Sequence, residues 1–170
     1  MSAGFPIYPG CPVCGDPAVN PAALGVRWRW DAERRAVAGE FTPGAAHTGY
    51  EGRLHGGILS SLLDEAMAWA CAVERGSYCV TGELGVRFKA GARLGEPLQV
   101  SAQAGSGWGR YLRASAEARS PRGELIAEAT ATFAALPRED SLRLRAALRF
   151  APGDLDVLAE AAPRPQSPLP

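Results

Sequence analysis

The clearest pattern of apolar positions lies near the middle of the chain and predicts a helix. Apolar side chains recur there at intervals of three and four residues, at Leu59, Leu62, Leu63, Ala66, Met67, Trp69, Ala70 and Val73. This spacing places them on one wide face of a helix. The glycine pair Gly56 and Gly57 stands just before the pattern, and Gly76 follows it as a C-terminal cap. We expect a helix over residues 58–75 that is buried on most of its sides.

The segments before and after this helix have strand composition or alternate apolar and polar residues with a period of two, which predicts β-strands. Two such segments precede the helix, at residues 24–30 and 36–41, and the polar turn 31–35 between them makes a hairpin. Four follow it, at residues 78–90, 97–105, 111–120 and 125–136. A helix in this order can bury its apolar surface only against one curved antiparallel sheet. The predicted fold class is therefore α+β.

The chain of 170 residues is long enough for one domain with a proper core. Residues 1–25 are rich in Pro, Gly and Ala and predict an ordered but irregular N-terminal arm. The main domain then covers residues 26–136. Residues 137–162 form a C-terminal extension with a short helix at 141–150 and another helical turn or two at 154–162. The Pro-rich tail 163–170 is expected to be disordered.

Charge and hydropathy exclude several classes of protein. Eighteen basic and eighteen acidic side chains give a formal net charge of zero, which argues against nucleic acid or an anionic membrane as the main partner. No apolar run approaches the roughly twenty residues of a membrane span. Residues 1–10 lack the features of a signal peptide. We therefore expect a cytoplasmic protein whose four cysteines are thiols.

The arm contains one sharp motif, Cys11-Pro12-Val13-Cys14-Gly15. A zinc site needs about four ligands, and this motif supplies two. His47 and His55 would have to complete the site from more than thirty residues away. No strand–helix unit of the thioredoxin kind surrounds the cysteines, which argues against a redox dithiol. We predict a pair of free thiols and no metal.

Two carboxylates, Asp64 and Glu65, interrupt the apolar helix. A carboxylate in a core either has partners or has a chemical function. The free N–H groups at the helix start, beside Gly56 and Gly57, can stabilise an oxyanion. Asp64 lies roughly 12 Å further along the axis of the same helix. If both groups act on one substrate, a second copy of the chain has to supply one of them.

The motif His55-Gly56-Gly57, followed after six residues by Asp64, resembles the hotdog-fold acyl-CoA thioesterases, in particular the phenylacetate-pathway type and the wider 4-hydroxybenzoyl-CoA thioesterase superfamily. Residues 80–89 resemble the first long strand after the helix in that family, residues 95–98 the next turn, and residues 128–133 the last strand. The resemblance covers roughly residues 11–136. It implies a hotdog fold, in which a curved antiparallel sheet wraps one long central helix.

The resemblance also implies roles for individual residues. Gly56 and Gly57 would polarise a thioester carbonyl, and Asp64 of the partner subunit would act as general base or nucleophile. Thr81 aligns with a residue that orients the attacking water, although a plain strand residue is an equal alternative. His55 either fixes the entry to the helix or transfers a proton, and we favour the first. Hydrolysis of a thioester requires only a base and an oxyanion site, so we expect no cofactor; coenzyme A is part of the substrate.

Substrate contacts are harder to assign from the sequence. Relatives often carry Asn or Gln where this chain has Gly49, so His55 or Tyr50 would supply that polar contact. Glu65 is expected to pair with a neighbour or the partner subunit at the substrate site. Arg87 and Lys89 are candidates to bind the phosphate groups of coenzyme A. The expected assembly is a homodimer or a dimer of dimers. Two alternatives remain open, namely an acyl-CoA sensor without turnover and an acyl-thioester hydratase or dehydratase.

Overall fold

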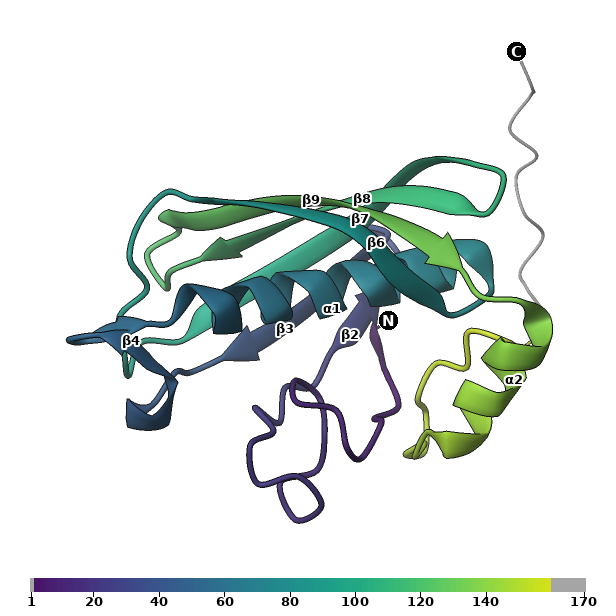
Figure 1. Cartoon of the computed structure of the whole chain (residues 1–170), viewed down its shortest axis with the longest axis horizontal. Coiled ribbons are helices and arrows are strands. Elements are labelled where there is room, and N and C mark those ends of the chain that lie inside the picture. Colours follow the sequence, from purple (N-terminus) through teal and green to yellow (C-terminus); the bar gives the residue numbers. More distant parts are fainter. Residues whose placement is uncertain (1, 160–170) are drawn as a thin grey trace.

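One curved antiparallel sheet lies along a long helix in the computed structural model, which describes residues 2–159 (Figure 1). The helices are α1 (Gly56–Arg75) and α2 (Arg138–Ala147), with a short 3-10 turn at Ala45–His47. The strands are β1 (Ser2–Gly4), β2 (Arg29–Asp31), β3 (Ala36–Phe41), β4 (Thr48–Tyr50), β5 (Arg53–Leu54), β6 (Cys79–Phe88), β7 (Leu98–Trp108), β8 (Tyr111–Arg119) and β9 (Leu125–Ala135). The predicted α+β hotdog fold is confirmed.

The main sheet has seven strands in the order β1-β2-β3-β7-β8-β9-β6, and β4 pairs separately with β5. Every pairing is antiparallel. The order leaves β6 at one edge, with β9 as its only partner among the described residues. A bulge between Thr81 and Glu83 interrupts the β6–β9 register near the start of β6. This long edge strand runs beside α1, and its residue Thr81 contacts Asp64 of that helix.

Large side chains on the helix and small ones on the sheet build the core. Leu62, Leu63 and Met67 of α1 are fully buried. The inner face of β7, β8 and β9 presents mostly buried alanines: Ala102, Ala114, Ala116, Ala118, Ala127, Ala129 and Ala131. Because an alanine protrudes little, the sheet can approach the helix closely and curve around it at native packing density.

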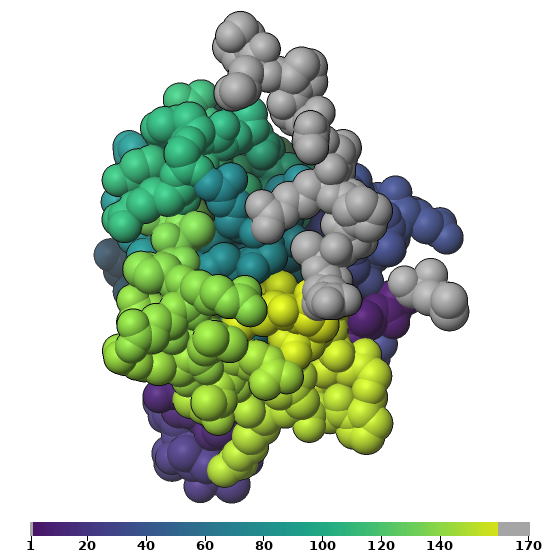
Figure 2. Space-filling view, turned by 90° about the vertical axis from the view of Figure 1, so that its right-hand side faces the viewer, coloured from purple at the N-terminus to yellow at the C-terminus, as the bar shows by residue number. Residues whose placement is uncertain are grey.

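The N-terminal arm covers the side of α1 that faces away from the sheet (Figure 1). Phe5 stacks on Trp69 of the helix with ring centroids 4.6 Å apart. Beyond the C-terminal end of α1, α2 and the segment after it lie together on one end of the molecule (Figure 2). Gly76 ends α1 in the left-handed conformation, as its position predicted. No helix within residues 2–159 is long and apolar enough to span a membrane.

Three local predictions were wrong. Residues 24–28 do not form a strand of the sheet, because Leu24 and Val26 donate their N–H groups to Pro12 and Val13 of the arm instead. The strand predicted at 97–105 is longer, since β7 continues to Trp108. The predicted helical turn beyond residue 153 is absent from the described residues up to 159, where Asp side chains accept backbone N–H groups in local turns. Residues 160–170, including the tail expected to be disordered, lie outside the described residues.

Candidate active site

Asp64 and Thr81 form the polar pair at the centre of the candidate site. Asp64 projects from α1 toward the edge strand β6, where the Thr81 hydroxyl donates a hydrogen bond to its Oδ1 atom at 2.9 Å. Asp64 is partly buried and Thr81 is exposed. The Oδ2 atom of Asp64 has no hydrogen-bond partner within residues 2–159. One carboxylate oxygen is therefore held in place while the other stays available as an acceptor.

Burial is the main influence on the charge of Asp64. Removing the carboxylate partly from water raises its pKa, and the hydrogen bond from Thr81 acts in the opposite direction. No cation forms a salt bridge with this carboxylate in the described part of the chain. A carboxylate with few stabilising partners is a better proton acceptor than one that is held in an ion pair.

The start of α1 is shaped by His55. This residue is the N-cap, and its Nδ1 atom accepts the N–H of Gly57 at 2.9 Å. The amide of Gly57 is therefore already engaged, which argues against its predicted role as a second oxyanion donor. The N–H of Gly56, the first residue of the helix, has no partner among the described residues. The helix start thus offers one free donor, and His55 occupies the anchoring role that we favoured.

The edge strand β6 connects the two parts of the site along the molecular surface. Thr81 near its start contacts Asp64, and the Phe88 ring at its end lies beside Gly56, where a Cβ atom would meet it at 3.3 Å. Gly56 and Asp64 are eight residues apart on one straight helix, about 12 Å by the helical rise. A single copy therefore presents the donor and the carboxylate at separate places.

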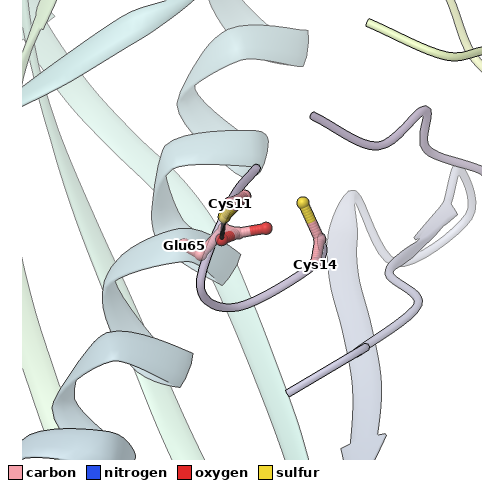
Figure 3. A group of neighbouring side chains, drawn as sticks. All are labelled: Cys11, Cys14 and Glu65. Carbon is pink, nitrogen blue, oxygen red and sulfur yellow. Dashed lines mark hydrogen bonds between the residues drawn. The ribbon is translucent and has the colours of Figure 1, made fainter. Parts of the chain in front are cut away.

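Glu65 points to a different face of the helix from the one that meets Thr81, because consecutive helical residues are about 100° apart. Its Oε1 accepts the Trp28 indole N–H at 3.1 Å, and its Oε2 lies 3.0 Å from the Cys11 sulfur (Figure 3). Burial, followed by the charge on Cys11, raises the pKa of Glu65 to about 8. The structure thus pairs Glu65 with neighbours in its own chain, one of the two arrangements expected for it, and separates it from the Asp64–Thr81 pair.

The remaining predicted residues fall into two groups. Gly49 and Tyr50 belong to the β4–β5 hairpin that leads into α1, and the Tyr50 side chain is exposed. At Gly49 a Cβ atom would come within 2.9 Å of His55, so the small residue permits a close approach. Arg87 and Lys89 instead pair with Glu128 at 3.8 and 2.9 Å. The structure therefore does not bring these two cations to Asp64.

A hollow formed by residues 2–159 lies apart from the polar pair. It has a volume of 840 Å³ and lies across the strands, lined by residues that include Arg34, Gln103 and Glu117. Neither Asp64 nor Gly56 contributes to its wall. This hollow is therefore not a pocket for a substrate at Asp64.

A family model for the thioesterase superfamily matches residues 51–127, a range that includes Gly56, Asp64 and Thr81. The helix α1 and the strands β6, β7 and β8 of this chain are thus similar to the thioesterase superfamily. The arm before residue 51 lies outside the match. No curated protein sequence matches the chain.

Solved structures of thioesterases share the fold. One thioesterase superfamily protein is 26% identical with a TM-score of 0.67, and the match covers 74% of this chain but only 60% of that protein. A phenylacetic acid degradation-related protein from Ralstonia eutropha JMP134 is 28% identical with a TM-score of 0.59, over 69% of this chain and 89% of its own. A Streptococcus pneumoniae TIGR4 thioesterase protein crystallised with coenzyme A is 18% identical with a TM-score of 0.56, over 59% and 80%, and shows the shared fold alone.

Proposed function

We propose that this chain is a member of the thioesterase superfamily and that it hydrolyses acyl-CoA thioesters to the free acid and coenzyme A. The observation that carries the proposal is the Asp64 carboxylate, which is partly buried, fixed through one oxygen by Thr81 and free at the other. The superfamily match supports thioester chemistry in general, and the coenzyme A in the Streptococcus relative makes CoA thioesters the first substrates to test.

Two chemical routes fit this arrangement. In the first, Asp64 takes a proton from water while the water oxygen bonds to the thioester carbonyl carbon. The C–S bond then breaks, and the CoA sulfur leaves as a thiol after it receives a proton. In the second, Asp64 itself attacks the carbonyl carbon, the C–S bond breaks and CoA leaves as the thiol after it takes up a proton. Water then hydrolyses the resulting mixed anhydride to the free acid and restores the Asp64 carboxylate. Thr81 fixes the carboxylate in both routes, so its contact supports an orienting role on Asp64.

The Gly56 amide is the proposed donor to the carbonyl oxygen as negative charge develops there. A backbone N–H at a helix start is suited to this task because it is preorganised and carries partial positive charge. Gly56 and Asp64 of one chain are too far apart to act on the same carbonyl group. The complete site therefore combines Asp64 of one copy with Gly56 of the partner subunit.

The edge strand β6 offers a way to bring the two copies together. It exposes Val80, Leu84 and Phe88, with 49%, 36% and 54% of each residue accessible. A long exposed edge strand with apolar side chains favours pairing with another strand. If two copies of β6 pair antiparallel with Gly85 on their two-fold axis, the extra residue of the bulge between Thr81 and Glu83 places Thr81 opposite Phe88 of the partner subunit.

That register has a direct consequence for the site. Thr81 marks the position of Asp64 on one copy, and Phe88 marks the position of Gly56 on the other. The two-fold axis then brings the carboxylate of each copy toward the helix start of its partner and produces two equivalent sites. Tyr50, exposed on the hairpin before α1, would border the acyl group in this arrangement.

The test is thiol release from a panel of short, long and aryl acyl-CoAs, measured with a chromogenic thiol reagent after removal of reducing agent. We expect turnover with at least one class, and the preferred substrate would describe the acyl pocket. Calorimetric binding of the same acyl-CoAs without thiol release would contradict hydrolysis and identify a sensor instead. Product analysis by mass spectrometry distinguishes hydrolysis from hydration of the acyl chain.

A further inference from the structure

Three potential metal ligands meet between the N-terminal arm and α1. The sulfur atoms of Cys11 and Cys14 and a carboxylate oxygen of Glu65 all lie within 4.8 Å of one another (Figure 3). The two cysteines come from the arm, and Glu65 comes from the helix at a distance of more than fifty residues in the sequence. Cys14 is buried, whereas Cys11 and Glu65 are partly accessible. All four cysteines of the chain are free thiols.

The turn that carries the cysteines is shaped around the first sulfur. The N–H of Val13 points to the Cys11 sulfur at 3.3 Å, and the N–H of Gly15 donates to the Cys11 carbonyl at 3.0 Å. A Cβ atom at position 15 would lie 2.0 Å from that carbonyl oxygen, so the turn requires glycine there. Backbone donors aimed at a sulfur stabilise the thiolate form, which is the form that binds metals.

Glu65 is oriented as a third ligand. The Trp28 indole N–H fixes Oε1 and leaves Oε2 directed at Cys11. No Lys, Arg or His within residues 2–159 forms a salt bridge with Glu65. A partly buried carboxylate between two thiols has an unbalanced charge when ionised, and a cation would compensate for it. A hydrogen bond to the non-ligating part of a side chain is a common support for metal ligands.

We propose that Cys11, Cys14 and Glu65 bind one Zn²⁺ ion, with a water molecule as the fourth ligand. Two thiolates and one carboxylate suit zinc in softness and charge, and harder cations such as Mg²⁺ and Ca²⁺ prefer oxygen ligands alone. Binding releases the protons of the cluster to solvent and forms two Zn–S bonds and one Zn–O bond without any change of oxidation state. The partial exposure of Cys11 and Glu65 leaves a path for the ion and the water.

The ion would fasten the arm to the central helix. Glu65 follows Asp64 in the sequence, so the zinc would hold the helix on a face about 100° around its axis from the one that meets Thr81. This site is independent of the proposed thioesterase activity, because none of its ligands contacts the Asp64–Thr81 pair. Its existence can be established even if the chain hydrolyses no acyl-CoA.

The first experiment is metal binding by the full-length, freshly reduced protein. Zinc content after equilibration with a weak competing chelator is measured by mass spectrometry of the metal, and Co²⁺ replaces Zn²⁺ for absorption spectra. We expect about one ion per chain and, with cobalt, sulfur-to-metal charge transfer together with tetrahedral visible bands. The variants Cys11→Ser, Cys14→Ser and Glu65→Gln should each weaken binding by more than about tenfold. Cys79→Ser, which removes a thiol outside the cluster, is the matched control.

The wild-type protein alone can decide the question if a ligand variant fails to fold. Loading with zinc should slow amide hydrogen exchange in residues 5–15 and leave β7 and β8 unchanged. Absence of stoichiometric binding by reduced wild type would overturn the proposal, as would a cobalt spectrum without thiolate charge transfer. A Cys11–Cys14 disulfide that forms equally fast with and without zinc would also overturn it, because a coordinated thiolate resists oxidation.

Discussion

Replacing Asp64 by Asn removes the proton-accepting carboxylate but keeps the shape of the side chain. The Asn Oδ1 atom can accept the Thr81 hydroxyl as the carboxylate does at 2.9 Å. The second position then carries an NH₂ group, which donates hydrogen bonds and cannot take a proton from water. General base catalysis typically contributes a factor of 10² to 10⁴ in rate. We therefore expect kcat for acyl-CoA hydrolysis to fall by about 10² to 10⁴, equivalent to about 3–5 kcal/mol in activation free energy.

The same substitution should not weaken the fold. Burial disfavours the ionised form of Asp64 and raises its pKa, so a neutral side chain of the same shape removes a desolvation cost. We expect the free energy of unfolding of Asp64→Asn to stay within about 1 kcal/mol of wild type, or to increase. Thiol release under saturating acyl-CoA gives kcat, and urea unfolding gives the stability.

The control is Glu74→Gln, which also replaces a carboxylate on α1. Glu74 is exposed and pairs with Arg35 at the surface, so its loss should change stability by less than about 1 kcal/mol and leave kcat unaffected. If Asp64→Asn kept more than about a third of wild-type kcat while folding normally, Asp64 would be neither the base nor the nucleophile. An unfolded variant would instead show that Asp64 has a structural role that its single hydrogen bond does not explain.

Substitutions at three further positions test the supporting residues. Thr81→Val should lower kcat about tenfold because it removes the hydrogen bond that orients Asp64, whereas Thr81→Ser should retain activity; equal kinetics of the two would refute the orienting role. His55→Ala should lower the free energy of unfolding in urea by about 1 kcal/mol, because it removes the N-cap of α1. His55→Ser can cap the helix again and should restore both stability and activity. Restored stability without activity would show that the imidazole transfers protons. Leu84→Lys should convert a dimer to monomers in light scattering and abolish turnover, because the proposed axis places both lysines close together; an active, dimeric variant would exclude this edge.

The fold could be predicted in outline because its strongest signals are local. The apolar spacing of α1 and the cap at Gly76 predicted the end of the helix to the residue. The predicted start at residue 58 is two residues late, because Gly56 and Gly57 are poor helix formers and do not indicate a helical turn by themselves. The sequence could not show that the His55 side chain accepts the Gly57 N–H and stabilises that turn.

The arm and its contacts could not be predicted in the same way. Residues 24–28 alternate like a strand, yet their backbone hydrogen bonds go to residues of the arm more than ten positions earlier. The meeting of Cys11 with Glu65 spans 54 positions, which no periodic pattern records. The available signal was indirect: a Cys-x-x-Cys pair without enough ligands, and an acidic residue on an otherwise apolar helix. A carboxylate can ligate zinc as a histidine does, and the fold rather than the sequence spacing brings Glu65 to the two cysteines.

The two neighbouring carboxylates of α1 show how one buried helix can serve two purposes. A step of about 100° directs Asp64 to the edge strand and Glu65 to the arm. Asp64 has one hydrogen bond and a free oxygen, a state that suits a reacting group. Glu65 uses both oxygens on the indole of Trp28 and the thiol of Cys11, a state that suits a fixed ligand. The number and kind of partners, rather than the residue type or its place in the sequence, therefore distinguish the proposed catalytic carboxylate from the proposed metal ligand.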